Sequence, residues 1–273
     1  MRKVLFMKGS ELRLIEYMEG SKKRFIIPVY QRNYDWKIEN CKQLYDDLIQ
    51  VIKNNSKTHF FGSIVSVYEP SGRNTEFLII DGQQRLTTMS LLFLAMYNLL
   101  EEKIIISEDE SLKDQIYEDF LVDKYQPQEK RMKLKPIKND QKAFSKLFNS
   151  KDDYIKDSNL TINYSYFYER IQKQEITIDE LFDAICRLEI INITLNNEDN
   201  PQLIFESLNS TGLDLSEGDK IRNYILMGLP KQKQDEYYEK SEKNPNCLFV
   251  LFGIHVACGR CRGQVLLCVS CCG

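Results

Sequence analysis

Apolar residues recur with two different periods in the first hundred residues, and these periods predict both helices and strands. Residues 39–54 carry apolar side chains at helical spacing, which predicts an amphipathic helix. Residues 60–68 alternate in part, as a half-buried strand does, and Thr75–Asp81 is expected to pair with them in an antiparallel hairpin. A long and mostly buried helix is expected over residues 84–102.

Two further elements are expected ahead of this hairpin. Residues 10–20 predict an opening helix, because Ser10 can cap its start and Gly20 can end it. Residues 25–27 predict a short strand, and the proline that follows them favours an extended or edge conformation.

Beyond about residue 104 the pattern becomes dense in charge and mostly helical. Helices are expected over residues 108–121, 139–149, 163–175 and 177–188. Met132–Ile137 predicts a short extended piece, and Glu189–Leu195 alternates like a strand. The expected fold class is α+β, with a small mixed sheet and helices followed by a mostly helical subdomain.

These patterns divide the chain into three parts. We expect residues 1–104 to form the sheet domain and residues 105–246 to form a helical subdomain that completes the same module. Residues 247–273 are expected to be a separate tail, because six of the eight cysteines lie there.

The stretch that joins the hairpin to the long helix changes abruptly from apolar to polar residues. An apolar run ends at Asp81–Gly82, Gln83, Gln84 and Arg85 follow, and a second apolar run begins. The free N–H groups and partial positive charge of a helix start favour an anion such as phosphate. The guanidinium group of Arg85 would add a positive charge and several N–H donors. The alternative is an ordinary hairpin exit, in which Asp81 caps the helix and Arg85 is solvated.

A second polar stretch, residues 30–36, follows the first predicted strand. A packing loop with Trp36 in the core accounts for its aromatic residues. It does not account for Gln31 and Arg32, which therefore become candidate binding residues.

A third stretch lies at residues 201–222. A helix is expected to end at Asn209-Ser210-Thr211-Gly212, and Ser216 can cap a second helix. Lys220 and Arg222 lie early in that second helix, where the helix dipole prefers acidic residues. The two cations are therefore either solvated or placed to bind an anion, and an ordinary helix end remains the alternative.

The overall composition narrows the function classes. Charged residues make up 28% of the chain and apolar residues 42%, as in an ordinary soluble domain. The net charge of −3 provides no global attraction to nucleic acid, so any contact with DNA needs a local basic patch. We expect a cytoplasmic protein without a membrane partner, because the apolar part of the N-terminus is too short for a signal peptide and no apolar run spans a bilayer.

The known signatures of several enzyme classes are missing from the sequence. It contains neither a P-loop motif nor the glycine fingerprint of dinucleotide-binding folds. Its two histidines, His59 and His255, are too few for a histidine-rich metal site or an HNH-type nuclease centre. His59 is expected to be structural or solvated.

The tail contains two pairs of cysteines, Cys258 with Cys261 and Cys268 with Cys271. Such pairs suggest zinc, but only six residues separate them, whereas a zinc ribbon has about 15–20. The tail also lacks lysine and acidic residues, which favours a non-native segment translated out of frame. A small zinc knuckle and an apolar partner-binding tail are the alternatives.

Four motifs occur in order along the chain: Ile27–Trp36, Phe61–Val65, Asp81–Thr88 and Phe205–Ser216. Together they resemble the GmrS-type N-terminal domain of GmrSD restriction systems, over about residues 10–245. That domain is related to the ParB/sulfiredoxin-like fold, so the resemblance implies a small ParB-like sheet.

The resemblance also implies a function. Family members bind and hydrolyse a nucleoside triphosphate, with Mg²⁺, in modification-dependent restriction systems that act on phage DNA. On this chain Asp81 would position the metal ion or the attacking water, Gly82 and Gln83 would present backbone N–H groups to phosphates, and Arg85 would neutralise them. The remaining residues that the nucleotide site is expected to use are Gln31, Arg32, Gln84, Thr87, Asn209, Ser210, Thr211, Gly212, Lys220 and Arg222.

The chain departs from the family pattern at its C-terminal end. Complete members usually continue into a helical region and an HNH-type nuclease domain, whereas this chain ends in the cysteine-rich tail. We therefore expect a truncated module whose nuclease is lost in cis or supplied in trans. The alternatives are a ParB-like DNA or nucleotide sensor without hydrolysis, in which Tyr34 and Trp36 stack on a base, and a non-functional fragment.

Overall fold

The computed structural model describes residues 9–71 and 74–195, together with six single residues further along the chain: Leu226, Leu229, Lys233, Gln234, Glu236 and Tyr237. The chain divides into two compact units, Met1–Pro201 and Gln202–Gly273, and the fold described below is that of the first unit.

A six-stranded mixed sheet forms one side of this unit, with the strand order β1-β6-β3-β4-β2-β5. β3 and β4 form an antiparallel hairpin, and β1 pairs with β6 in the antiparallel sense. β6 runs parallel to β3, and β2 runs parallel to both β4 and β5. The strands are β1 (Gly9–Arg13), β2 (Lys23–Ile26), β3 (His59–Ser71), β4 (Asn74–Asp81), β5 (Leu134–Lys135) and β6 (Leu188–Leu195).

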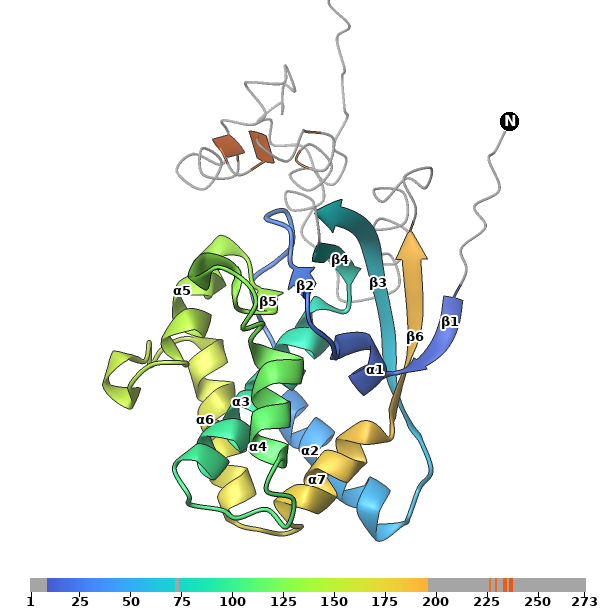
Figure 1. Ribbon diagram of the computed structural model, residues 1–273, viewed down its shortest axis with the longest axis vertical. Coiled ribbons are helices and arrows are strands. Elements are labelled where there is room, and N and C mark those ends of the chain that lie inside the picture. The colour runs from blue at the N-terminus through green and yellow to red at the C-terminus, as the bar shows by residue number, and fades with distance from the viewer. Residues whose placement is uncertain are drawn as a thin grey trace, which may run out of the picture. The chain divides into compact units, whose positions relative to one another are not determined.

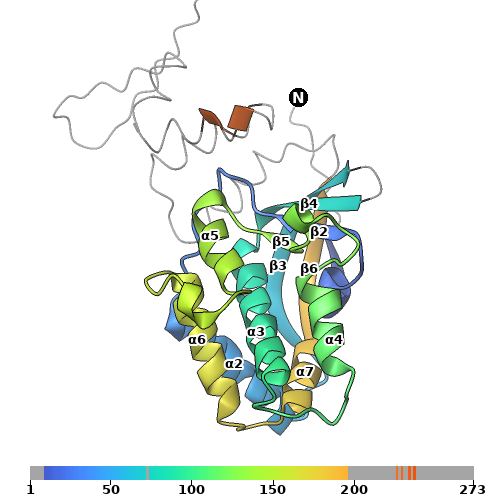
Figure 2. The same ribbon diagram turned by 60° about the vertical axis from the view of Figure 1, so that its left-hand side comes forward.

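The helices gather around α3, as both ribbon views show for α2, α4, α6 and α7 (Figures 1 and 2). The α-helices are α1 (Leu14–Met18), α2 (Ile38–Lys53), α3 (Gln83–Glu101), α4 (Leu112–Gln115), α5 (Lys138–Lys146), α6 (Asn159–Gln172) and α7 (Ile178–Cys186). A π-helical turn covers Ile116–Leu121, and short 3-10 turns cover Gln128–Lys130 and Lys151–Asp153. The architecture confirms the α+β class.

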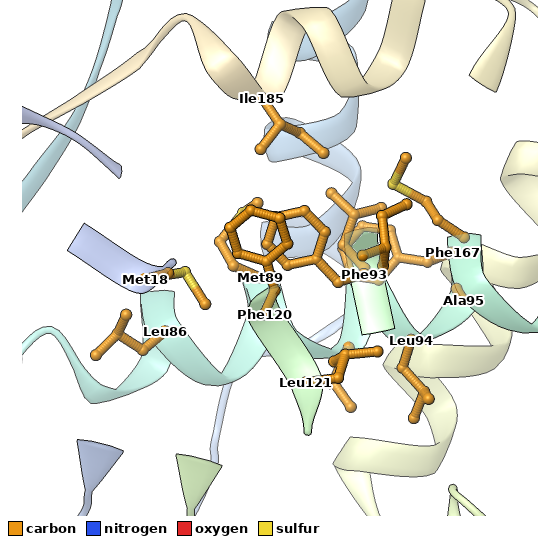
Figure 3. Packing of buried hydrophobic residues seen from close by; sticks show 14 of the residues in the cluster. Met18, Leu86, Met89, Phe93, Leu94, Ala95, Phe120, Leu121, Phe167 and Ile185 are labelled. Atoms are coloured by element: carbon orange, nitrogen blue, oxygen red, sulfur yellow. The ribbon is translucent and has the colours of Figure 1, made fainter. Parts of the chain in front are cut away.

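Helix α3 is the centre of the hydrophobic core. Fifteen of its 19 residues are buried, on every side of the helix, which is the pattern of a core helix rather than a surface helix. Figure 3 shows Phe93 of α3 beside Phe120, and their stacked rings lie 4.5 Å apart. The long apolar run after Arg85 is therefore explained by complete burial.

The hairpin, α2, α3 and β6 lie where the apolar pattern predicts them, within a few residues. The expected helix over residues 10–20 is wrong: residues 9–13 form β1, and only Leu14–Met18 are helical. Ser10 pairs with Asn192 of β6 instead of capping a helix, because hydrogen bonding to a distant strand outweighs local preference. The helix expected over residues 108–121 is interrupted and splits into α4 and the π-helical turn.

The sheet takes strands from both halves of the sequence. β6 lies between β1 and β3, and β5 forms an edge beside β2. In the part of the chain that the structure describes, no helix combines the length and apolar character that crossing a lipid bilayer requires.

Candidate functional site

A tight turn connects β4 to α3 and places the start of this helix beside β3. Gly82 is the N-cap residue of α3 and has a φ of +92°. A Cβ at this position would lie 3.0 Å from the carbonyl oxygen of Ser63 and 3.0 Å from the Ile64 side chain. Glycine is therefore required both by the backbone conformation and by the close approach of β3.

Arg85 and Asp81 face each other across this turn. The Arg85 Nη1 lies 3.8 Å from the Asp81 Oδ2, and both side chains are about one-third exposed. The same Nη1 donates a hydrogen bond to the carbonyl oxygen of Ser63. The guanidinium group is thus held against β3, next to an accessible carboxylate.

Gln84 holds the loop that follows β2. Its Oε1 accepts hydrogen bonds from the backbone N–H groups of Asp35 (2.9 Å) and Trp36 (3.2 Å), and its Nε2 donates to the Asn33 carbonyl oxygen (3.1 Å). Both ends of the amide are occupied by the protein, so the geometry gives Gln84 a role in shaping the site.

Gln31 has a similar role at the other end of this loop. Its side chain is only 4% exposed, and its Nε2 donates to the carbonyl oxygen of Ile80 at 2.8 Å. The bond ties the loop to the last residues of β4, directly ahead of the Asp81–Gly82 turn.

Tyr34 fixes the middle of the loop from inside the core. Its hydroxyl group lies 2.7 Å from the Thr88 Oγ1 and accepts a hydrogen bond from the Asn163 Nδ2 at 2.9 Å. Burial raises the pKa of Tyr34 well above its usual value. The alternative in which Tyr34 stacks on a base does not fit this enclosed position, and Trp36 packs against the core as a partly buried residue.

A small pocket lies between this loop, the first turn of α3 and the start of α5. Three polar side chains reach it without a hydrogen-bond partner among the described residues: Arg32, Gln83 and Thr87. Gln83 is 8% exposed and Thr87 only 2%. The complete lining is Ile27, Arg32, Tyr34, Gln83, Gln84, Thr87, Pro136, Ile137 and Asp140.

Asp140 supplies the negative charge of this pocket. Its Oδ2 accepts the Tyr34 backbone N–H at 2.6 Å. Burial raises the pKa of the Asp140 carboxyl group, and the hydrogen bond from Tyr34 opposes that shift. The sequence interpretation missed Asp140, since only the packing of α5 against the loop brings it here.

The structure therefore separates six of the predicted residues into two groups. Arg32, Gln83, Gln84 and Thr87 line the pocket, whereas Asp81 and Arg85 pair beside β3 and are not among its lining residues. The predicted residues of the third stretch lie outside the described residues, and so does the cysteine-rich tail. Those residues are Asn209, Ser210, Thr211, Gly212, Lys220 and Arg222.

The residues at the turn can be tested for their fit to Mg²⁺. Among the described residues, no three His, Cys, Asp or Glu side chains gather into a metal-binding group. Mg²⁺ is commonly held by one or two carboxylates together with substrate phosphates. Asp81, an accessible carboxylate at the end of β4, fits an ion shared with a bound nucleotide.

Comparison with known families identifies the chain. The model of the family described as "GmrSD restriction endonuclease, N-terminal domain" matches residues 14–226, more than three-quarters of the sequence. No curated protein matches the chain. The matched span includes the Asp81–Gly82 turn, the loop after β2 and every described strand except β1. The chain therefore belongs to the GmrSD restriction endonuclease family and contains the N-terminal domain of that family.

Proposed function

We propose that this domain binds a nucleoside triphosphate and hydrolyses it with Mg²⁺, and that this hydrolysis gates DNA cleavage in a cytoplasmic, modification-dependent restriction system that acts on phage DNA. The nuclease would be an HNH-type domain that acts together with this one. Family membership supports the connection to restriction. The unpartnered polar groups of the pocket carry the proposal that a ligand binds here.

The physical argument concerns the polar side chains that line the pocket without a protein partner. Arg32 is a half-buried cation without an ion-pair or hydrogen-bond partner among the described residues. Gln83 and Thr87 are more than nine-tenths buried and also lack partners there. A phosphate oxygen that reaches the pocket would accept hydrogen bonds from these groups.

The Asp81–Arg85 pair would serve the phosphate end of the nucleotide. Arg85 would neutralise phosphate charge, and Asp81 would orient the attacking water or hold the metal ion. The oxygen of that water bonds to the terminal phosphorus while the bond to the bridging oxygen breaks, giving a nucleoside diphosphate and inorganic phosphate. Mg²⁺, when bound, lowers the cost of the charge that develops on the phosphates.

The test uses the full chain with each nucleoside triphosphate and Mg²⁺, and it measures both nucleotide binding and phosphate release. Arg85→Ala is expected to lower phosphate release at least about a hundredfold. Arg187→Ala is the matched control, because Arg187 also pairs with an aspartate four residues earlier, Asp183, and also donates to a backbone carbonyl group. Unchanged hydrolysis by Arg85→Ala would show that the site assignment is wrong.

A second candidate function is a nucleotide sensor that binds without hydrolysis. It is favoured by the contacts of Arg85, whose guanidinium group already binds the Ser63 carbonyl oxygen and faces Asp81. This candidate predicts nucleotide binding that depends on Arg32, together with no phosphate release from the unaltered chain. The same two measurements therefore separate the two candidates.

A further inference from the structure

Helix α5 carries a row of lysines on one face. Lys138, Lys142 and Lys146 are spaced four residues apart, which places them along one side of an α-helix. We call these three residues the α5 lysine stripe. Lys138 and Lys142 are exposed, and Lys146 is half-buried. In both ribbon views α5 lies at the outside of the helical group (Figures 1 and 2).

The stripe belongs to the most basic segment of an acidic chain. Residues 128–146 contain seven lysines and arginines against two acidic residues, whereas the whole chain has a net charge of −3. One of the seven, Lys133, is buried. The other six are exposed or half-buried, so this segment forms the kind of local basic patch that DNA binding requires.

The positive charge of this segment is largely uncompensated. Lys142, Lys146 and the preceding Lys135 form no ion pair within the described part of the chain. The one acidic residue of α5, Asp140, instead accepts the Tyr34 N–H beside the pocket.

The spacing of the stripe suits a phosphate backbone. Four residues of an α-helix rise about 6 Å, and each DNA strand carries one charge about every 3.4 Å along its axis. Neighbouring lysines of the stripe can therefore neutralise separate phosphates.

We propose that the α5 lysine stripe, together with Lys135, binds the phosphate backbone of duplex DNA. The choice of DNA over an acidic protein rests on membership of a restriction endonuclease family. The surface is separate from the nucleotide pocket but adjoins it, because Ile137 and Asp140 at the start of α5 line that pocket. DNA bound here would contact the helix whose first turn borders the nucleotide.

The test measures binding of the full chain to a short fluorescein-labelled DNA duplex of mixed sequence, without nucleotide, over a series of salt concentrations. The Lys142→Ala/Lys146→Ala variant is expected to bind at least tenfold more weakly at low salt. The slope of log K against log salt is expected to fall by about two, because each lost phosphate contact contributes about 0.9.

The matched control is Lys53→Ala/Lys57→Ala, which removes two exposed lysines with the same sequence spacing and no ion pair among the described residues. The control is expected to keep the slope of the unaltered chain. The proposal is overturned if the stripe variant keeps its slope, if the control loses as much, or if the unaltered chain shows no salt-dependent binding to DNA. Phosphate release, assayed separately, reports on the nucleotide site and does not decide this result.

Discussion

The side chain of Arg85 lies directly against Gly62 of β3, where a Cβ would come within 2.6 Å of the Arg85 Nε. Gly62 has a φ of +124°, and the register of β3 against β6 shifts between Phe60 and Gly62. The bulge and the missing side chain together leave room for the guanidinium group to reach the Ser63 carbonyl oxygen. The second sequence motif, Phe61–Val65, thereby acquires a defined structural role.

Replacing Gly62 by alanine should therefore displace Arg85. The variant is expected to lose stability in urea, since a non-glycine residue at positive φ costs about 1–3 kcal/mol, and the displaced hydrogen bond adds about 1 kcal/mol. Gly20→Ala measures the cost of the positive φ without a displaced neighbour. Gly20 has a φ of +101°, and a Cβ added there would meet no atom within 4 Å. Equal losses for the two variants would mean that Arg85 is not constrained by Gly62.

Gln84→Met should loosen the loop after β2. The replacement has a similar volume but leaves the N–H groups of Asp35 and Trp36 and the Asn33 carbonyl group without their partner. We expect a loss of about 2–4 kcal/mol in the free energy of unfolding. Faster hydrogen exchange at the two amides would localise the effect.

The control for this variant is Gln43→Met on the surface of α2. Gln43 makes one side-chain hydrogen bond, to Asp47 at 2.8 Å, and is exposed. Its replacement is expected to change stability by less than about 0.5 kcal/mol. A similar small change for Gln84→Met would contradict the assigned role of Gln84.

Arg32→Ala should weaken nucleotide binding without affecting the fold. A hydrogen bond to a charged group contributes about 1.5–3 kcal/mol, which corresponds to a roughly 10–100-fold higher Kd. Titration calorimetry with the preferred nucleotide measures the change. Arg13→Ala is the control, because Arg13 is an exposed arginine of β1 without an ion pair among the described residues. Unaltered affinity of the Arg32 variant would exclude the pocket as the nucleotide site.

The buried Lys133 should make stability depend on pH in the alkaline range. Its side chain is 1% exposed, and its Nζ donates to the carbonyl oxygens of Met18 and Asp119. Burial lowers the pKa of Lys133 to about 8. Between about pH 8 and 10.5 the unfolded chain therefore binds more protons than the folded one, so the free energy of unfolding rises with pH across this window.

The gain is at most about 3 kcal/mol, because each pKa unit corresponds to about 1.4 kcal/mol. Lys133→Met lacks the titrating group, so the difference in unfolding free energy between the unaltered chain and this variant should change across the same window. Urea unfolding at a series of pH values gives both curves. Parallel curves would show that the burial of Lys133 does not shift its ionisation.

Elements whose conformation depends on residues close in the sequence could be predicted from the sequence alone. The burial of α3 follows from its uninterrupted apolar run, and the β3–β4 hairpin follows from two alternating segments around a short turn. β1 could not be predicted in this way, because its strand conformation depends on pairing with β6 at the far end of the described chain. The helix expected over these residues reflected local capping signals alone.

In the candidate site, too, features set by neighbouring residues could be predicted and features set by distant residues could not. The Asp81–Gly82 turn and the cation at Arg85 follow from consecutive residues. Asp140 could not be placed, because it lies 106 residues from Tyr34, whose N–H it accepts. The sequence also did not indicate that Gln31 and Gln84 would be occupied by backbone groups, since their partners lie on other segments.

The position of β6 has a consequence for biosynthesis. β6 lies between β1 and β3 in the sheet, and β1 pairs with β6. Gly9 is among the first described residues to leave the ribosome, but its partner Ile193 is synthesised much later. β1 therefore cannot pair until β6 has been made. Until then one edge of β3 has unpaired backbone groups, which are prone to association with other chains. Closing so long a loop is intrinsically slow. The sheet can therefore be completed only after translation has passed Leu195.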